Sequence, residues 1–157
     1  MAIDTWEDMH LLLAVFRIPE ISTSMTINGP APVILAMYFV AALESERERA
    51  EAERGASLSD EEREELDRRT LGELRGTVQA DILKEVQAQN ESIFPPDFAI
   101  RLLGDVQEWF IANGVRRFYS LSVSGYHIGE AGASPVQECS WDGVYLSIRP
   151  NQTPMKL

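Results

Sequence analysis

Two rows of small hydroxyl side chains and one histidine are the candidates for binding or catalysis in this sequence. The rows, each alternating with other residues, are Ser22, Ser24 and Thr26, and Ser120, Ser122 and Ser124. Hydroxyl groups along a strand leave free volume and hydrogen-bonding capacity, which suits the passage of a long polar ligand. His127 follows the second row, and an imidazole can hydrogen-bond or transfer a proton. The pattern alone is equally compatible with serine faces that are exposed to solvent and with a histidine that only packs in the core.

The sequence does not predict a metal site. His10, His127 and Cys139 are far apart, and no ligand spacing typical of zinc occurs among them. The single cysteine cannot form an internal disulfide and is more often a small buried hydrophobe than a nucleophile. We interpret His10 as a surface or helix residue.

Composition and charge exclude several classes of partner. The 157 residues suffice for one domain and carry 14 Lys and Arg against 25 Asp and Glu, a net charge of -11. Such acidity disfavours nucleic acid and anionic membranes, so an anionic ligand needs a local cationic patch such as Arg116 and Arg117. The longest apolar run, Ala31 to Leu43, is too short to span a bilayer. We expect a soluble, cytoplasmic protein.

Two strands and several helices would position these residues. Alternation predicts strands over 21–27 and 118–124. Helices are expected over 4–16, from Pro30 to about Leu43, over 81–89 and over 97–113, with residues 76–79 as a short link. The last helix should bury a stripe made of Phe98, Leu102, Val106, Trp109 and Phe110. Strands that alternate with helices indicate an α/β fold with a parallel sheet. An antiparallel sheet whose serine face is exposed to solvent remains an alternative.

A charged segment, Glu44 to Arg75, interrupts this alternation. Gly55-Ala56-Ser57 should divide it into two helices, and Ser59 with Glu62 forms a capping box for the second. We interpret the segment as a solvated helical insertion, because charged blocks usually stay in water. An acidic module that docks a partner is the alternative.

Three long motifs then resemble the methylmalonyl-CoA mutase family. They are Ser22-Thr23-Ser24-Met25-Thr26-Ile27-Asn28-Gly29, Arg75-Gly76-Thr77-Val78-Gln79-Ala80-Asp81-Ile82-Leu83-Lys84-Glu85, and Ser122-Val123-Ser124-Gly125-Tyr126-His127-Ile128-Gly129-Glu130-Ala131-Gly132-Ala133. The likeness runs from about Asp4 to Glu138, apart from the charged insertion. It implies part of a (β/α)8 TIM barrel threaded by coenzyme A, with a divergent tail over 139–157.

The resemblance also implies roles for matching positions. The barrel strands would line the acyl-CoA channel, the segment over 77–79 would bind the CoA or thioester part, Arg117 would contact a CoA phosphate, and His127 would hydrogen-bond the thioester carbonyl. The implied substrate-binding residues are Ser24, Thr26, Thr77, Val78, Gln79, Gln89, Arg117 and His127, of which His127 is also the catalytic candidate. Ala88 and Glu130 would lie near the cofactor, adenosylcobalamin.

Gln89 is an informative departure within this family. The methylmalonyl-CoA mutases have an arginine here that pairs with the substrate's carboxylate, a charge-assisted contact that glutamine cannot replace. Isobutyryl-CoA mutases have glutamine, and the fused forms resemble this chain most closely. The resemblance therefore implies conversion of isobutyryl-CoA to n-butyryl-CoA, with a methylmalonyl-CoA mutase large-chain fragment as the alternative.

The remaining mutase segments are expected partners of this chain. A complete barrel needs about 250 residues, and the Asp-x-His-x-x-Gly cobalamin motif is absent from the sequence. We therefore expect the main cobalamin-binding domain to lie outside this chain, the chain alone to be inactive, and the intact enzyme to be oligomeric. A non-catalytic truncated remnant is a further alternative. The abrupt change at Cys139 would also follow from a frameshift.

Overall fold

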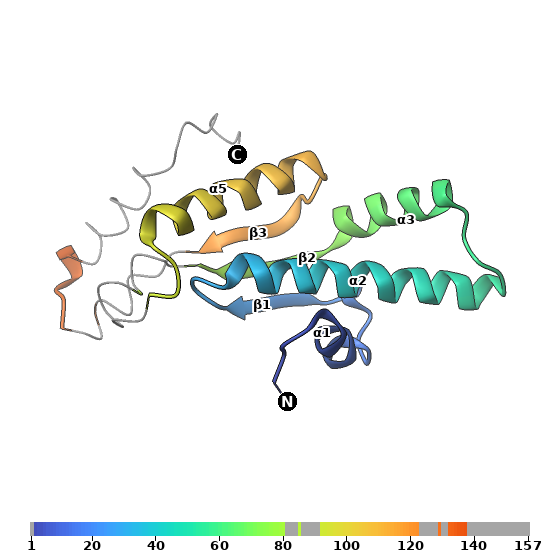
Figure 1. Cartoon of the computed structure of the whole chain (residues 1–157), viewed down its shortest axis with the longest axis horizontal. Coiled ribbons are helices and arrows are strands. Elements are labelled where there is room, and N and C mark those ends of the chain that lie inside the picture. Colours follow the sequence, from blue (N-terminus) through green and yellow to red (C-terminus); the bar gives the residue numbers. More distant parts are fainter. Residues whose placement is uncertain (1, 81–84, 86–91, 123–128, 130–131, 138–157) are drawn as a thin grey trace.

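The protein is an α/β structure in which helices pack against one face of a three-stranded parallel sheet (Figure 1). The computed structural model describes residues 2–80, 85, 92–122, 129 and 132–137. The strands are β1 (Ser22–Thr26), β2 (Arg75–Gln79) and β3 (Arg117–Ser122), in the order β1-β2-β3. The helices are α1 (Trp6–Leu13), a 3-10 turn (Ile18–Glu20), α2 (Ala31–Arg54), α3 (Asp60–Glu73) and α5 (Pro96–Ala112).

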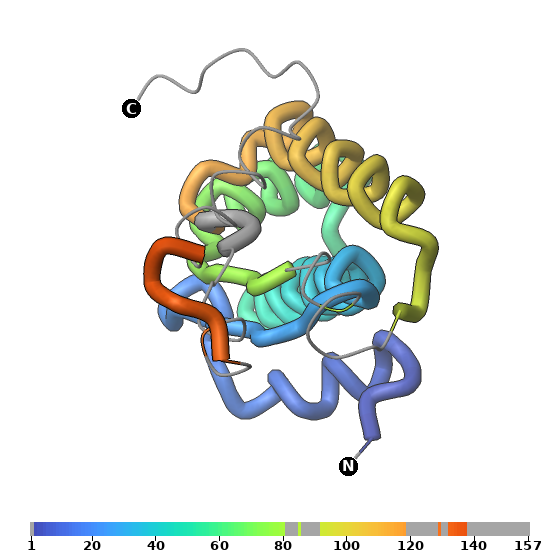
Figure 2. Tube along the Cα trace, turned by 90° about the vertical axis from the view of Figure 1, so that its left-hand side faces the viewer, coloured from blue at the N-terminus to red at the C-terminus, as the bar shows by residue number. Residues whose placement is uncertain are grey.

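The alternation in the sequence correctly predicts β1. Thr23 and Met25 are half-buried on the helix side, whereas Ser22, Ser24 and Thr26 are exposed on the other side. All strand pairs are parallel, which removes the antiparallel alternative for this sheet. The carboxyl ends of the strands point left in Figure 1 and toward the viewer in Figure 2.

The segment predicted as a short link is instead the central strand, β2. It pairs with both neighbours, with Ser24 opposite Thr77 and Gly76 opposite Phe118. Gly76 is required there, because a Cβ would lie 2.5 Å from both the Phe118 ring and the Thr23 carbonyl oxygen. The prediction failed because this five-residue strand has little apolar alternation, and its two neighbours stabilise its extended state.

A single helix, α2, replaces the two helices expected on either side of Leu43. It runs 24 residues to Arg54 and ends at Gly55, whose φ of 72° is left-handed. No glycine or proline interrupts residues 33–54, and alanine, glutamate and arginine there favour a continuous helix. The break at Gly55 and the Ser59–Glu62 capping box of α3 are as predicted.

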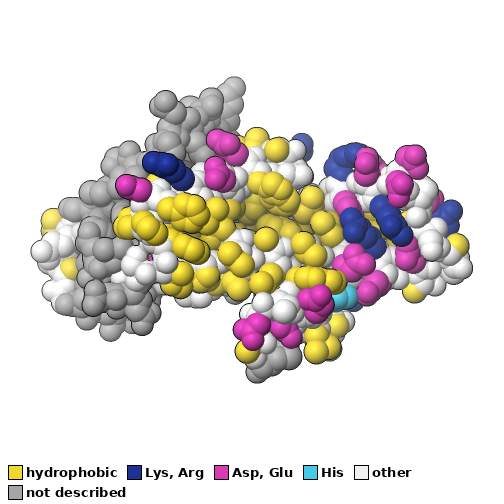
Figure 3. All heavy atoms as spheres, in the orientation of Figure 1, with side chains coloured by type: hydrophobic (Ala, Val, Ile, Leu, Met, Phe, Trp, Pro, Cys, Tyr) yellow, Lys and Arg dark blue, Asp and Glu magenta, His cyan; other side chains and the backbone are white. Residues whose placement is uncertain are grey.

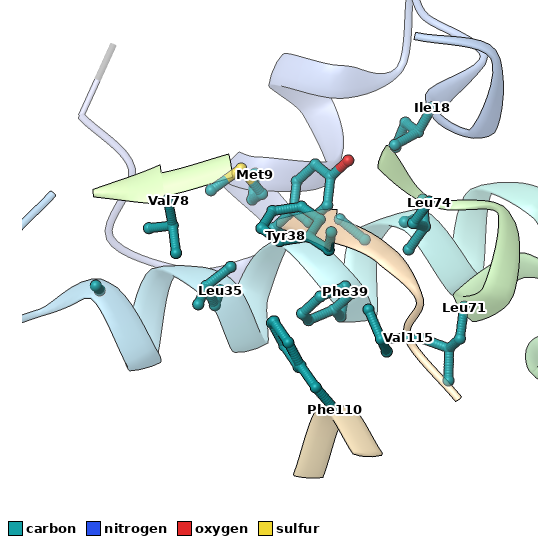
Figure 4. Close-up of a cluster of buried hydrophobic side chains, with 14 of the residues drawn as sticks. Met9, Ile18, Leu35, Tyr38, Phe39, Leu71, Leu74, Val78, Phe110 and Val115 are labelled. Atoms are coloured by element: carbon teal, nitrogen blue, oxygen red, sulfur yellow. The ribbon is translucent and has the colours of Figure 1, made fainter. Parts of the chain in front are cut away.

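The core lies between the sheet and helices α2 and α5 (Figure 4). Phe39 is central, with its ring 5.3–5.6 Å from four other aromatic rings. The buried face of α5 is made of Ala99, Leu103 and Phe110, whereas Phe98 and Trp109 are 50% and 41% exposed. The predicted stripe is therefore correct at Phe110 and at Val106, which packs against the core, whereas Phe98 and Trp109 are exposed and Ala99 and Leu103 are buried in addition.

The end of α2 and α3 form a charged hairpin, residues 44–73, beyond the amino ends of the strands (Figures 1 and 3). Arg47 bridges the two helices through an ion pair with Asp67 and also pairs with Glu44 on its own helix, and Arg63 reaches back to Glu51. Among the described residues, no helix is long and apolar enough to cross a membrane.

Candidate functional site

The face of the sheet opposite α2 and α5 is polar along β1 and β2. Ser24 and Thr77 are register partners, and their hydroxyl oxygens are 3.0 Å apart, within hydrogen-bonding distance. Ser24 is exposed and Thr77 half-buried. This pair is the middle row of a face that offers hydroxyl donors and acceptors to a ligand lying along the strands.

The row at the carboxyl end of this face is formed by Thr26 and Gln79. They are register partners, and the Ile27 N–H donates to the Gln79 carbonyl oxygen at 3.1 Å. The Gln79 side-chain amide nitrogen is buried and has no hydrogen-bond partner within the described part of the chain. Because a buried amide donor without a partner is costly, Gln79 is suited to donate to a ligand carbonyl.

Val78 does not share this face. Its side chain is fully buried on the helix side, so only its backbone could meet a ligand in the open face. Behind β1, Tyr38 and Thr23 share a hydrogen bond of 3.2 Å. Burial raises the pKa of the Tyr38 hydroxyl, and the bond to Thr23 offsets part of that rise. This neutral, packed layer supports the polar face from behind.

Two arginines occupy the amino end of the sheet. Arg75 and Arg117 are register partners at the starts of β2 and β3, and Arg75 donates to the Glu20 carbonyl oxygen at 2.8 Å. Like charges directly opposite on neighbouring strands repel each other, and a bound anion would relieve that repulsion. Arg116 and Arg117 also line a groove of about 850 Å³ between α3, α5 and the start of β3.

Several predicted site residues lie outside the described residues: Ala88, Gln89, His127 and Glu130. The structure therefore brings together Ser24, Thr26, Thr77 and Gln79, and places Arg117 at the opposite end. In β3, the backbone register sets Tyr119 beside Thr77 and, after a shift, Ser122 beside Gln79. Within the part of the chain that is described, no group of His, Cys, Asp or Glu could hold a metal ion.

One buried acid near the carboxyl ends was not predicted. Glu85 is 6% exposed, and its Oε1 accepts a hydrogen bond of 2.5 Å from the Gly29 N–H. The sequence held one signal, since α2 begins after Pro30 with no acidic residue in its first turn and no side-chain cap. A helix start with no acidic residue of its own favours an anion supplied from elsewhere in the chain.

These features define an α/β segment with a covered apolar face and an open polar face along parallel strands. The methylmalonyl-CoA mutase family matches residues 1–142. The chain therefore belongs to the methylmalonyl-CoA mutase family.

The curated relatives include several acyl-CoA mutases. The fused isobutyryl-CoA mutase of Geobacillus kaustophilus is 50% identical over 143 residues, which are 90% of this chain and 13% of the relative. The methylmalonyl-CoA mutase of Escherichia coli is 38% identical over 147 residues, 92% of this chain and 17% of the relative. The 2-hydroxyisobutanoyl-CoA mutase large subunit of Aquincola tertiaricarbonis is 39% identical over 141 residues, 90% of this chain and 21% of the relative. The chain thus spans a small part of the length of these relatives.

Proposed function

We propose that this chain is part of the substrate-binding (β/α)8 barrel of an adenosylcobalamin-dependent acyl-CoA mutase that acts on isobutyryl-CoA. Residues 4–138 would be the barrel segment, 44–75 its helical insertion and 139–157 a divergent tail. The observation that carries the proposal is the open hydroxyl face of β1 and β2, with α2 and α5 on the opposite side. Helices on one side are expected of a barrel wall, whereas an open doubly wound sheet is covered on both faces.

The open face supports a binding mode for the acyl-CoA. Arg117, with Arg75 beside it, would hold a CoA phosphate at the amino end, because guanidinium groups bind phosphates through paired hydrogen bonds. Ser24 and Thr77 would then hydrogen-bond the polar tail along the strands. Thr26 and Gln79 would meet the thioester end, where barrels of this kind carry their chemistry. The backbone of Val78 completes this stretch.

The corrin of the intact enzyme would be held mainly outside this chain. The sequence lacks the Asp-x-His-x-x-Gly motif, and the described residues hold no cluster of metal ligands. Adenosylcobalamin supplies radical chemistry in such enzymes, and Ala88 and Glu130 remain proposed neighbours of it. This chain's own task would be to orient the substrate and exclude water.

His127 is the proposed catalytic residue, holding the thioester carbonyl by a hydrogen bond. Loss of one such contact costs about 2–4 kcal/mol of transition-state stabilisation. In the intact enzyme, His127→Ala should therefore slow isomerisation about a hundredfold or more, with substrate affinity much less affected. Unchanged turnover in a steady-state assay would remove His127 from the mechanism.

Gln89 supports the choice of substrate, together with the identities of 46–50% to fused isobutyryl-CoA mutases against 37–38% to methylmalonyl-CoA mutases. The test is a chimera in which residues 1–142 replace the matching segment of the Geobacillus kaustophilus enzyme. Coenzyme-dependent turnover of isobutyryl-CoA, faster than that of methylmalonyl-CoA, is expected. The opposite preference would favour the methylmalonyl-CoA alternative. A folded but inactive chimera would favour a non-catalytic remnant.

A further inference from the structure

We infer that Glu85 is a positioning residue, whose buried carboxylate clamps the turn after β1 and so fixes the ligand-facing end of β1 and β2. The inference rests on the function proposed above and adds a residue outside the binding face. Glu85 lies six positions after Gln79 in the chain and meets Gly29, three positions after Thr26. The Glu85–Gly29 contact therefore joins the two segments that directly follow Thr26 and Gln79.

The Gly29 backbone and the Glu85 carboxylate approach each other closely. The Gly29 N–H donates to Oε1 of Glu85, and a Cβ on Gly29 would lie 2.9 Å from Oε2. A larger residue at position 29 would therefore displace the carboxylate from its present position. Since Glu85 is 6% exposed, burial of its carboxylate is tolerable only where donors compensate for lost water.

The Glu85 carboxylate also places a negative charge near the start of α2, where the helix has none of its own. Pro30 gives no side-chain cap, and the first turn of α2 contains no acidic residue. The amino end of this 24-residue helix carries a partial positive charge, which favours a nearby anion. Glu85 provides that anion from a distant part of the chain, so the start of α2 is coupled to the segment that follows β2.

The coupling continues into the row that would meet the thioester. Directly before the clamped turn, the Ile27 N–H donates to the Gln79 carbonyl oxygen. The buried side-chain amide of Gln79, which has no partner among the described residues, belongs to that same residue. Displacement of the turn would therefore shift Gln79 relative to a bound substrate, and small misplacements of this kind reduce catalysis strongly.

The test uses the chimera described above, with substitutions at the two sides of the contact. Glu85→Ala should lower kcat about tenfold while KM for isobutyryl-CoA changes less than about threefold, since misorientation affects the transition state more than tail binding. Glu85→Gln keeps an acceptor oxygen and should stay within about threefold of the parent in kcat. Glu108→Ala, at an exposed position of α5, is the matched control and should equal the parent.

A double-mutant cycle with Gly29→Ala separates positioning through this contact from general destabilisation. Gly29→Ala alone should lower kcat, but it should cost much less when Glu85 is already alanine, because both changes break one contact. Exchange of the Gly29 amide hydrogen should be slow in the parent and fast in Glu85→Ala. Should Glu85→Ala fail to fold, Glu85→Asp, which withdraws the carboxylate by one methylene, should show the same selective fall in kcat.

Two outcomes would overturn the inference. An active parent chimera in which folded Glu85→Ala keeps the parent kcat, or in which the two substitutions are additive, rejects the clamp and leaves the proposed function intact. A parent chimera that is folded and inactive rejects the proposed function, and the positioning role with it.

Discussion

Phe39 and Arg47 lie about two turns apart on α2, yet they belong to regions stabilised in different ways. Phe39 is 4% exposed and packs against four aromatic rings within the body, by which we mean the sheet, α1, α5 and the first half of α2. Arg47 belongs to the charged hairpin and is held by Glu44 and Asp67. Figure 3 shows the same division on the surface, with apolar side chains over the body and charged ones gathered on the hairpin.

This difference indicates which region can tolerate substitutions. Apolar burial and close packing are worth several kcal/mol per large side chain, whereas exposed ion pairs are each worth about 1 kcal/mol or less. The body should therefore set the global free energy of unfolding. The hairpin should open locally, at a lower free energy, and respond to salt and acid.

The largest effect should come from the body. Phe39→Ala removes the ring at the centre of the aromatic cluster and should lower the free energy of unfolding by about 3–5 kcal/mol. Urea denaturation followed by tryptophan fluorescence would measure it, since Trp109 packs against Phe39. Val40→Ala, one position along at a half-exposed site, is the control and should cost far less. Equal losses would mean that this cluster is not the core.

A smaller effect should come from the cap of α3. Ser59 accepts from the Glu62 N–H and Glu62 accepts from the Ser59 N–H, so Ser59→Ala should cost about 1 kcal/mol within the hairpin. Hydrogen exchange should accelerate over α3 and remain unchanged over the sheet. Ser57→Ala, in the preceding loop, serves as the control. Acceleration over the sheet as well would contradict the separation of the two regions.

The smallest effect should appear on acidification. The Leu58 N–H and then Arg63 hold the pKa of Glu51 below its ordinary value of 4.5, and the Ser59 N–H and then Arg54 do the same for Glu62. Because both pKa values are lowered by folding, the stabilisation is present above pH 4.5 and is lost as the pH falls through the lowered values. Hydrogen exchange should show α3 opening before the sheet, and high salt should weaken the same region at neutral pH. Simultaneous loss of protection in both regions would contradict this.

Sequence reasoning succeeded where a signal is local. The alternating hydroxyls of β1, the helix break at Gly55 and the capping box of α3 depend on residues a few positions apart. The resemblance to the mutases also rests on contiguous motifs, and the family match confirms it.

The features that the sequence did not predict depend on residues that are distant in the chain. β2 is a strand because β1 and β3 flank it, and Arg75–Gln79 alone carries no such signal. The buried face of α5 was predicted only in part: Phe110 is buried, whereas Phe98 and Trp109 are apolar yet exposed, and only packing distinguishes them from Ala99 and Leu103. Glu85 was missed for the same reason, since its donor, Gly29, lies 56 positions away.

The length of α2 also bears on how such a chain could diversify. A helix of 24 residues is about 36 Å long, whereas a strand of five residues spans about 17 Å, so roughly half of α2 extends past the sheet. Both connections of the hairpin leave and re-join the body at the amino ends of the strands, opposite the Thr26–Gln79 row. Whole helical turns could therefore be gained or lost in the hairpin over evolutionary time without altering strand register, which leaves the hairpin free to vary while selection acts on the strands.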